Sequence, residues 1–325
     1  AEVIFAATRR GPERQILGDA GYQVELVRVE PLRGGSPMRK LKGIATLPLA
    51  LIDAARLLRR ARPDVVMGVG GYLSGPLLAV ASLAGAPTLL LEPNVKPGLA
   101  NRWLSRLVDA AAVAWEETGR HFGDKAFVSG NPVRQGIARV ASQLPNGDVR
   151  LLVLGGSQGS TPLNCAMVEA LPYLRDQRQR LHMTHQTGKA DLEMVRAAYQ
   201  KEAFAARVEP YLRNMESEYA DCNMVVSRAG ATTCAELAAA GRPSVLIPLP
   251  AAGGHQQHNA AAMRRAGAAA VILQSELSGA RLSGTLVQLL QEPGQLQHMS
   301  ERARALARPE AAQMIAERLA QLARH

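Results

Sequence analysis

The segment 225–260 combines a glycine turn before a helix with a polar loop. An apolar run ends at Ser227, Gly230 follows, and Thr232 and Thr233 lead into an Ala/Leu-rich segment. This order predicts strand, loop and helix, which directs free backbone N–H groups at an anion. A second apolar run, 244–249, ends in a loop rich in glycine, histidine and glutamine. The segment therefore indicates binding of an anion that carries polar groups.

Two other interpretations of this segment stay open: a helix-capping role for Glu236, and a plain polar loop and helix cap for the Gly-Gly-His-Gln-Gln-His run at 253–258. Thr233 and Glu236 have the spacing of a capping box, so Glu236 serves either the helix or a ligand. His255 and His258 could suggest a metal, but no carboxylate or cysteine lies close by in sequence to complete a ligand set. We therefore expect no metal site and no cofactor.

Three further loops have similar character. Residues 68–75 read GVGGYLSG before Pro76, 92–98 read EPNVKPG, and 155–161 read GGSQGST before Pro162. Each follows an apolar run. The loops at 68–75 and 155–161 precede helix starts, which favours phosphate binding, with a tight strand-to-helix turn as the alternative for 155–161. The loop at 92–98 follows a strand, which is where α/β folds bind ligands. None has the G-x-G-x-x-G or Walker pattern, which argues against a dinucleotide dehydrogenase and a nucleoside triphosphatase.

Composition narrows the class of protein. The chain has 325 residues, 47% of them hydrophobic, a formal charge of +10 and three cysteines. The odd, scattered cysteines indicate a reduced compartment. The positive charge indicates an anionic partner, yet only 4% of residues are aromatic and no nucleic-acid-binding motif occurs, so we expect no nucleic acid partner.

Strands and helices alternate along the whole chain, which predicts the α/β class with parallel sheets. The pattern restarts after the polar segment 143–148, so we expect two doubly wound, Rossmann-like domains whose glycine loops face one cleft. The chain opens at Ala1 at the edge of a strand, and we expect an upstream segment to be missing from this sequence.

The segment 31–63 alternates basic and apolar blocks. Arg33, Arg39, Lys40 and Lys42 lead into leucines and isoleucines, and further arginines follow. Such a segment either lies on an anionic membrane surface or forms a core helix with a solvated basic face.

A nucleotide diphosphate suits two converging glycine loops. No Asp-x-Asp occurs, so a divalent ion held by paired carboxylates is not expected. Helix N-termini, backbone N–H groups and Arg134 would carry the charge instead.

Seven ordered motifs, spread over nearly the whole chain, resemble those of the MurG family of N-acetylglucosaminyltransferases. They are GVGGYLSGP at 68–76, EPN at 92–94, GNPVR at 130–134, GGSQGS at 155–160, HQTG at 185–188, SRAGATTCAELAAAGRP at 227–243 and HQQHNA at 255–260.

The resemblance implies a GT-B glycosyltransferase that moves N-acetylglucosamine from UDP-N-acetylglucosamine to undecaprenyl-diphospho-muramoyl-pentapeptide (lipid I). It implies an acceptor domain at 1–133, a donor domain at 134–308 and a terminal helix, 309–325, that packs back on the first domain. It also implies a peripheral protein on the cytoplasmic face of the bacterial inner membrane, docked on anionic lipid through Arg33, Arg39, Lys40, Lys42 and adjacent apolar residues.

The same resemblance assigns donor-binding residues. Arg134 and Ser157 would contact the diphosphate, the Leu212 backbone the uracil, Ala231, Thr232 and Thr233 the phosphates, and Glu236 the ribose, while Asn94 and Gln256 would face the sugar. Weaker candidates are Gly70, Gly71, Gly156, His255 and Asn259.

The sequence departs from the family at its start. The family's first glycine loop carries a candidate general base, and no residue here replaces it, so no catalytic residue is assigned. A UDP-sugar-binding protein without catalysis, and a related enzyme such as a UDP-N-acetylglucosamine 2-epimerase, remain alternatives.

Overall fold

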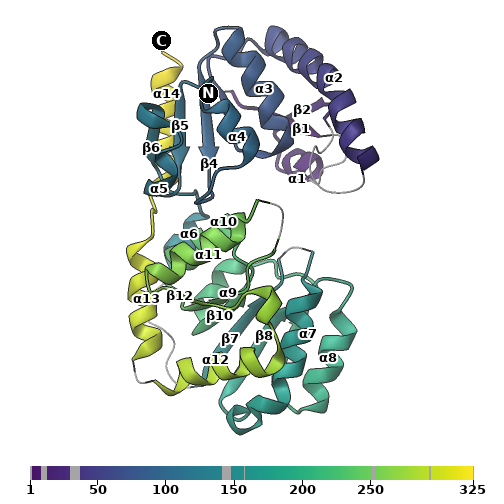
Figure 1. Ribbon diagram of the computed structural model, residues 1–325, viewed down its shortest axis with the longest axis vertical. Coiled ribbons are helices and arrows are strands. Elements are labelled where there is room, and N and C mark those ends of the chain that lie inside the picture. The colour runs from purple at the N-terminus through teal and green to yellow at the C-terminus, as the bar shows by residue number, and fades with distance from the viewer. Residues whose placement is uncertain are drawn as a thin grey trace. The chain divides into compact units, whose positions relative to one another are not determined.

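The computed structural model describes residues 2–8, 13–29, 37–140, 148–156, 158–250, 253–292 and 294–324, without the side chains of 15 and 37–45 (Figure 1). The chain folds into two compact units. The first unit comprises 1–129 and 313–325, and the second comprises 130–312. Each is described by itself.

The first unit contains two parallel sheets, ordered β1-β2 and β3-β4-β5-β6. Its elements are β1 (Ile4–Thr8), α1 (Glu13–Asp19), β2 (Gln23–Val27), α2 (Pro37–Ala61), β3 (Val66–Gly68), α3 (Gly71–Leu83), β4 (Thr88–Glu92), α4 (Leu99–Leu104), β5 (Ala110–Val113), α5 (Glu116–Gly119), η1 (Gly123–Lys125), β6 (Ala126–Val128) and α14 (Ala311–Leu322).

The four-stranded sheet of the first unit is covered on both faces. Successive residues of a strand point to opposite faces, so Leu90 packs with α3 and α4 while Leu89 and Leu91 point the other way. Ile315 of α14 packs against this second face. Helix α14 is therefore part of the hydrophobic core on this second face of the sheet, together with β4 and β5.

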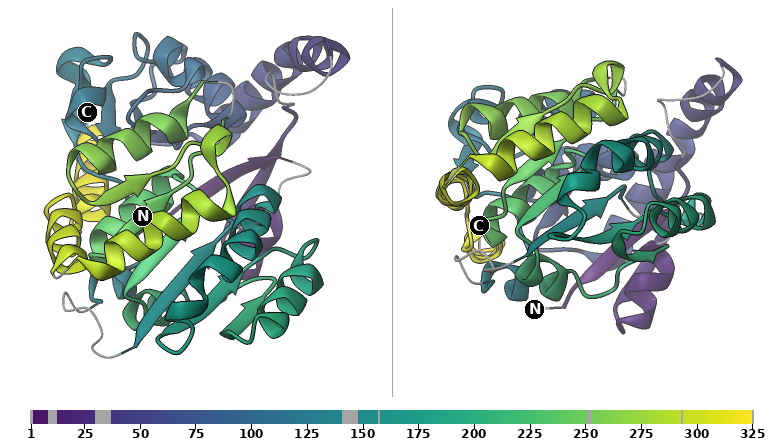
Figure 2. Two further views of the ribbon diagram at one scale, coloured as in Figure 1. Left: turned by 60° about the horizontal axis from the view of Figure 1, so that its bottom comes forward. Right: turned by 90° about the horizontal axis from the view of Figure 1, so that it is seen from below.

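The second unit is built on one six-stranded parallel sheet, ordered β12-β11-β10-β7-β8-β9. Its elements are α6 (Gln135–Ala138), β7 (Val149–Leu154), α7 (Thr161–Ala170), η2 (Leu171–Gln177), β8 (Leu181–Gln186), α8 (Leu192–Lys201), β9 (Ala205–Glu209), α9 (Met215–Asp221), β10 (Met224–Ser227), α10 (Ala231–Ala240), β11 (Ser244–Leu246), α11 (His255–Arg265), β12 (Ala269–Val271), η3 (Gln274–Glu276), α12 (Gly279–Gln291) and α13 (Gln295–Ala305). Figure 2 shows its strands running side by side in one twisted layer.

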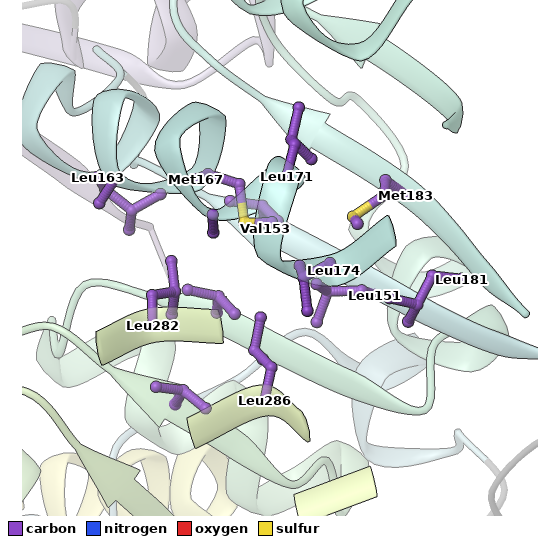
Figure 3. Packing of buried hydrophobic residues seen from close by; sticks show 14 of the residues in the cluster. Leu151, Val153, Leu163, Met167, Leu171, Leu174, Leu181, Met183, Leu282 and Leu286 are labelled. Carbon is purple, nitrogen blue, oxygen red and sulfur yellow. The ribbon is translucent and has the colours of Figure 1, made fainter. Parts of the chain in front are cut away.

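The main core of the second unit lies on one face of this sheet. Leu151 and Val153 of β7 point toward Met167 of α7 and Leu286 of α12, as Figure 3 shows. All of these side chains are at least 99% buried. Removing a large buried side chain from such a core lowers the free energy of unfolding by about 2 to 5 kcal/mol. The packed core therefore holds the strands in place, and with them the loops at their ends.

All three sheets are parallel and confirm the predicted α/β class, although some element boundaries differ from prediction. Pro76 was expected at a helix start, but α3 begins five residues earlier, at Gly71. Strand β9 ends at Glu209, so Leu212 lies in the loop that follows it. None of the helices in the described ranges is long and apolar enough to cross a membrane.

Candidate active site

Loops that follow adjacent strands of the second unit gather most of the predicted site residues. Its strands are all parallel, so their carboxyl ends share one edge of the sheet. Gly156 follows β7, Leu212 follows β9, Ala231 follows β10 and Gln256 follows β11. Ligands of open α/β sheets bind at this edge.

The glycine loop after β7 is pressed against the loop after β8. A Cβ on Gly159 would lie 2.1 Å from the Thr187 carbonyl oxygen, and one on Gly188 would lie 2.4 Å from that of Gln158. Both glycines also have positive φ, +81° and +78°. Only glycine allows this approach. Ser157, the predicted diphosphate contact of this loop, lies outside the described residues.

Helix α10 presents its first turn at the same edge. It begins at Ala231, and its N-cap residue, Gly230, has no side chain with which to cap it. Thr232 and Thr233 therefore belong to the first turn, whose N–H groups have no partner one turn earlier in the helix. The capping-box interpretation is wrong, because Thr233 lies inside the helix. The arrangement suits an anion.

Glu236 lies one turn further along α10 and is held by a tyrosine. The hydroxyl of the buried Tyr219 donates to Glu236 Oε2 at 3.1 Å. Burial raises the pKa of Glu236, while Tyr219 and the positive charge of Arg134 oppose this rise. Arg134 is the N-cap residue of α6, so the structure brings these two predicted residues into electrostatic contact.

Gln256 and Asn259 of α11 hold the loop that precedes α10. Gln256 Oε1 accepts from the backbone N–H groups of Ala229, at 3.2 Å, and Leu249, at 2.9 Å. Asn259 Nδ2 donates to the Ala229 carbonyl at 3.2 Å. The side-chain oxygen of Gln256 therefore holds the loops after β10 and β11 together. His255 is the first residue of α11, and the described residues contain no group of three metal-binding side chains.

Arg228, which directly follows β10, joins three loops of this edge. Its guanidinium donates to Ser160 Oγ at 3.0 Å, to the Ile247 carbonyl at 3.1 Å and to Gln274 Oε1 at 2.7 Å. All three acceptors are neutral, and burial lowers the pKa of Arg228. A buried cation at this edge favours an anionic ligand.

In the first unit, Asn94 belongs to a cluster around the buried Glu92. Glu92 Oε1 accepts from the backbone N–H of Asn94 at 2.9 Å and from its side-chain amide at 3.0 Å. Glu92 Oε2 accepts from the N–H of Gly98 at 3.0 Å and from Asn101 Nδ2 at 2.8 Å. A Cβ on Gly70 would lie 3.5 Å from Asn101 Nδ2, which places this predicted glycine beside the cluster.

Profiles of two protein-family domains match this chain over most of its length. The Glycosyltransferase family 28 N-terminal domain matches residues 1–113, and the Glycosyltransferase family 28 C-terminal domain matches residues 150–318. The chain belongs to glycosyltransferase family 28. The two family domains correspond to the main part of each compact unit.

Relatives within the family align over almost the whole chain. A UDP-N-acetylglucosamine--N-acetylmuramyl-(pentapeptide) pyrophosphoryl-undecaprenol N-acetylglucosamine transferase of Myxococcus xanthus is 43% identical over 320 residues, which cover 97% of this chain and 84% of the relative. A protein of the same name from Geobacter sulfurreducens is 38% identical over an alignment that covers 98% of this chain and 89% of the relative.

Solved structures agree on the fold. The crystal structure of Acinetobacter baumannii MurG superposes with a TM-score of 0.82 at 28% identity, covering 98% of this chain and 91% of that one. UDP-N-acetylglucosamine 2-epimerase from Neisseria meningitidis, bound to UDP-GlcNAc, has a TM-score of 0.69 at 13% identity, covering 98% and 91%. This second likeness shows the fold alone.

Two residues that support this site, Arg228 and Tyr219, were not predicted from the sequence. Arg228 has a usable signal in the sequence, since it directly follows a buried strand and precedes a glycine turn. Burying a charged side chain there costs free energy unless the side chain forms hydrogen bonds or an ion pair. Tyr219 has none, because its hydroxyl meets Glu236 only through the packing of α9 beside α10.

His185 gives the second unit a specific sensitivity to acid. Its Nε2 donates to Asn164 Oδ1 at 3.0 Å and its Nδ1 accepts from the Tyr199 hydroxyl at 3.1 Å, and burial lowers the pKa of His185 to about 3. An unfolded histidine takes up a proton below about pH 6.5 and the folded one does not, so stability is lost as the pH falls below 6.5. We expect His185 to lower the free energy of unfolding by about 2 kcal/mol at pH 5 relative to pH 7.

Urea unfolding at pH 7 and pH 5 measures this loss. A His185→Gln variant should show a smaller difference between the two pH values than the unmodified protein. His182→Gln is the matched control, since His182 lies on the same strand but is exposed, and it should keep the difference. An unchanged pH dependence in His185→Gln would contradict the prediction.

Proposed function

We propose that this protein is an inverting glycosyltransferase that moves N-acetylglucosamine from UDP-N-acetylglucosamine to the 4-hydroxyl of the muramoyl group of lipid I, giving lipid II. The observation that carries the proposal is the alignment, over 97% of the chain, with a relative named for this transfer. The edge of the second unit agrees, because it combines a glycine loop, an uncapped helix start, a carboxylate and arginines.

In the proposed reaction the acceptor hydroxyl attacks the anomeric carbon of the donor and releases its proton to water, and the bond from that carbon to the diphosphate breaks. UDP leaves with the bonding electron pair, so negative charge develops on the diphosphate. The first-turn N–H groups of α10 and the guanidinium of Arg134 are the groups proposed to stabilise this charge. The second unit is proposed to bind the donor and the first unit the acceptor.

We propose a peripheral association with the cytoplasmic face of the bacterial membrane. The described part of α2 exposes Leu47, Leu49, Leu51 and Ile52 and also the basic side chain of Arg59. Apolar and basic side chains together favour an anionic lipid surface. Arg33 and the side chains of Arg39, Lys40 and Lys42 lie outside the described residues, so they remain predictions.

A transfer assay tests the proposal. Radiolabelled UDP-N-acetylglucosamine and a lipid I analogue should give a labelled disaccharide product, and donor incubated alone should stay unchanged. Conversion of donor without acceptor would identify an epimerase instead. Binding of UDP without transfer would identify a binding protein.

Glu236→Gln gives the assay a residue-level prediction. The glutamine keeps an oxygen for Tyr219 but loses the charged acceptor proposed for the ribose hydroxyls, so affinity for UDP should fall about tenfold. Titration calorimetry measures the loss. Glu218→Gln is the control, because Glu218 is half-buried like Glu236 but lies on α9 and pairs with Arg207, and this variant should bind UDP normally. Unchanged UDP binding by Glu236→Gln would remove Glu236 from the site.

A further inference from the structure

Gln186, the last residue of β8, connects the two loops on either side of its strand. Its side-chain Nε2 donates to the Gly156 carbonyl oxygen at 2.9 Å. Its Oε1 accepts from the backbone N–H of Leu212 at 2.8 Å. Strand β8 lies between β7 and β9 in the sheet, so one side chain spans the loops that follow both neighbours.

The chemistry of this bridge requires an amide. The Gly156 carbonyl needs a donor and the Leu212 N–H needs an acceptor, and a glutamine amide offers one of each. Gln186 is 5% exposed and Leu212 is 3% exposed, so solvent replaces neither bond easily. An apolar side chain here would leave both backbone groups unsatisfied, and a glutamate would place a carboxylate against a carbonyl oxygen.

We propose that Gln186 is a positioning residue for the donor nucleotide. It sets the spacing between Gly156, in the loop after β7, and the segment at 210–213, so that a single ligand reaches both. This inference rests on the proposed function, which assigns the diphosphate to the first loop and the uracil to the Leu212 backbone.

A spacing role makes a distinct prediction about ligand size. UDP spans both loops, whereas uridine needs only the segment around Leu212. Loss of the bridge should therefore weaken UDP more than uridine. A residue that only supported overall stability would affect the two ligands equally, or neither of them, at temperatures well below unfolding.

Calorimetric titration of Gln186→Met with UDP and with uridine tests the proposal. We expect the dissociation constant of UDP to rise about tenfold or more and that of uridine to rise about threefold or less. The KM for UDP-N-acetylglucosamine should rise in parallel. Gln186→Glu keeps the acceptor for Leu212 and loses the donor for Gly156, so it should show the same pattern and provides a second variant if the first folds poorly.

Asn223 offers a matched control, because it lies at the amino ends of the strands, whereas the site lies at their carboxyl ends. It is also a buried amide, and its Oδ1 accepts from the Arg150 N–H at 2.8 Å, far from the loops. Asn223→Leu should lower thermal stability and leave UDP binding within about twofold.

The outcomes separate the two proposals. If the unmodified protein fails to bind UDP, both the function and this inference are overturned. If it binds UDP while both Gln186 variants bind UDP as tightly, or lose UDP and uridine equally, the inference alone is overturned.

Discussion

Arg228→Lys is expected to weaken binding of UDP about a hundredfold although it keeps the positive charge. The guanidinium of Arg228 makes three directed hydrogen bonds, to Ser160, Ile247 and Gln274, and a lysine ammonium on a differently shaped stem cannot reproduce that fork. The loops after β7, β10, β11 and β12 would lose their common tie.

Titration calorimetry with UDP, at a temperature where circular dichroism shows the variant folded, measures this effect. Arg264→Lys is the control, since Arg264 lies in the same unit on α11 but is exposed, and it should bind UDP normally. Arg228→Lys with near-normal UDP affinity would show that charge alone matters at this position.

Glu92→Gln is expected to destabilise the first unit by about 2 to 4 kcal/mol. Each carboxylate oxygen of Glu92 accepts from one backbone N–H, that of Asn94 or of Gly98. Neighbouring side-chain amides can rotate to suit a glutamine, but backbone donors cannot. Whichever way the new amide turns, its NH₂ group faces one of these two N–H groups, and that donor loses its partner.

Amide hydrogen exchange reports this change locally, with faster exchange expected at Asn94 and Gly98. The exposed Glu116→Gln, on α5 of the same unit, is the control and should change stability by no more than about 0.5 kcal/mol. Unaltered exchange at both amides would mean that the cluster is not held by the charge of Glu92.

The family and its function were predicted correctly from seven motifs. Many residues of these motifs are glycines at positions where the backbone conformation or a close contact excludes other residues. Gly159 and Gly188 show why, since each lies where a Cβ would collide with a neighbouring carbonyl. A glycine needed for close approach is visible in the sequence at the position where it acts. Alternation of strands and helices likewise predicted the α/β class.

Hydrogen bonds from a side chain to groups distant in sequence were not predictable in this way. Gln186 belongs to a recognised motif, yet its partners Gly156 and Leu212 are 30 and 26 residues away and meet it only through the strand order of the sheet. The capping-box interpretation of Thr233 failed for a related reason. Spacing alone does not reveal where a helix starts, and α10 starts two residues earlier, at Ala231.

The packing of α14 has a consequence for synthesis of the chain. Ile315 and Leu319 cover the sheet face formed by Leu89, Leu91, Ala110 and Ala112, more than two hundred residues earlier. A ribosome delivers the whole second unit before it delivers this helix. During translation the second unit can therefore complete its core first, while the first unit keeps an apolar face uncovered until α14 emerges. An apolar face exposed in this way is prone to aggregation while the chain is being made.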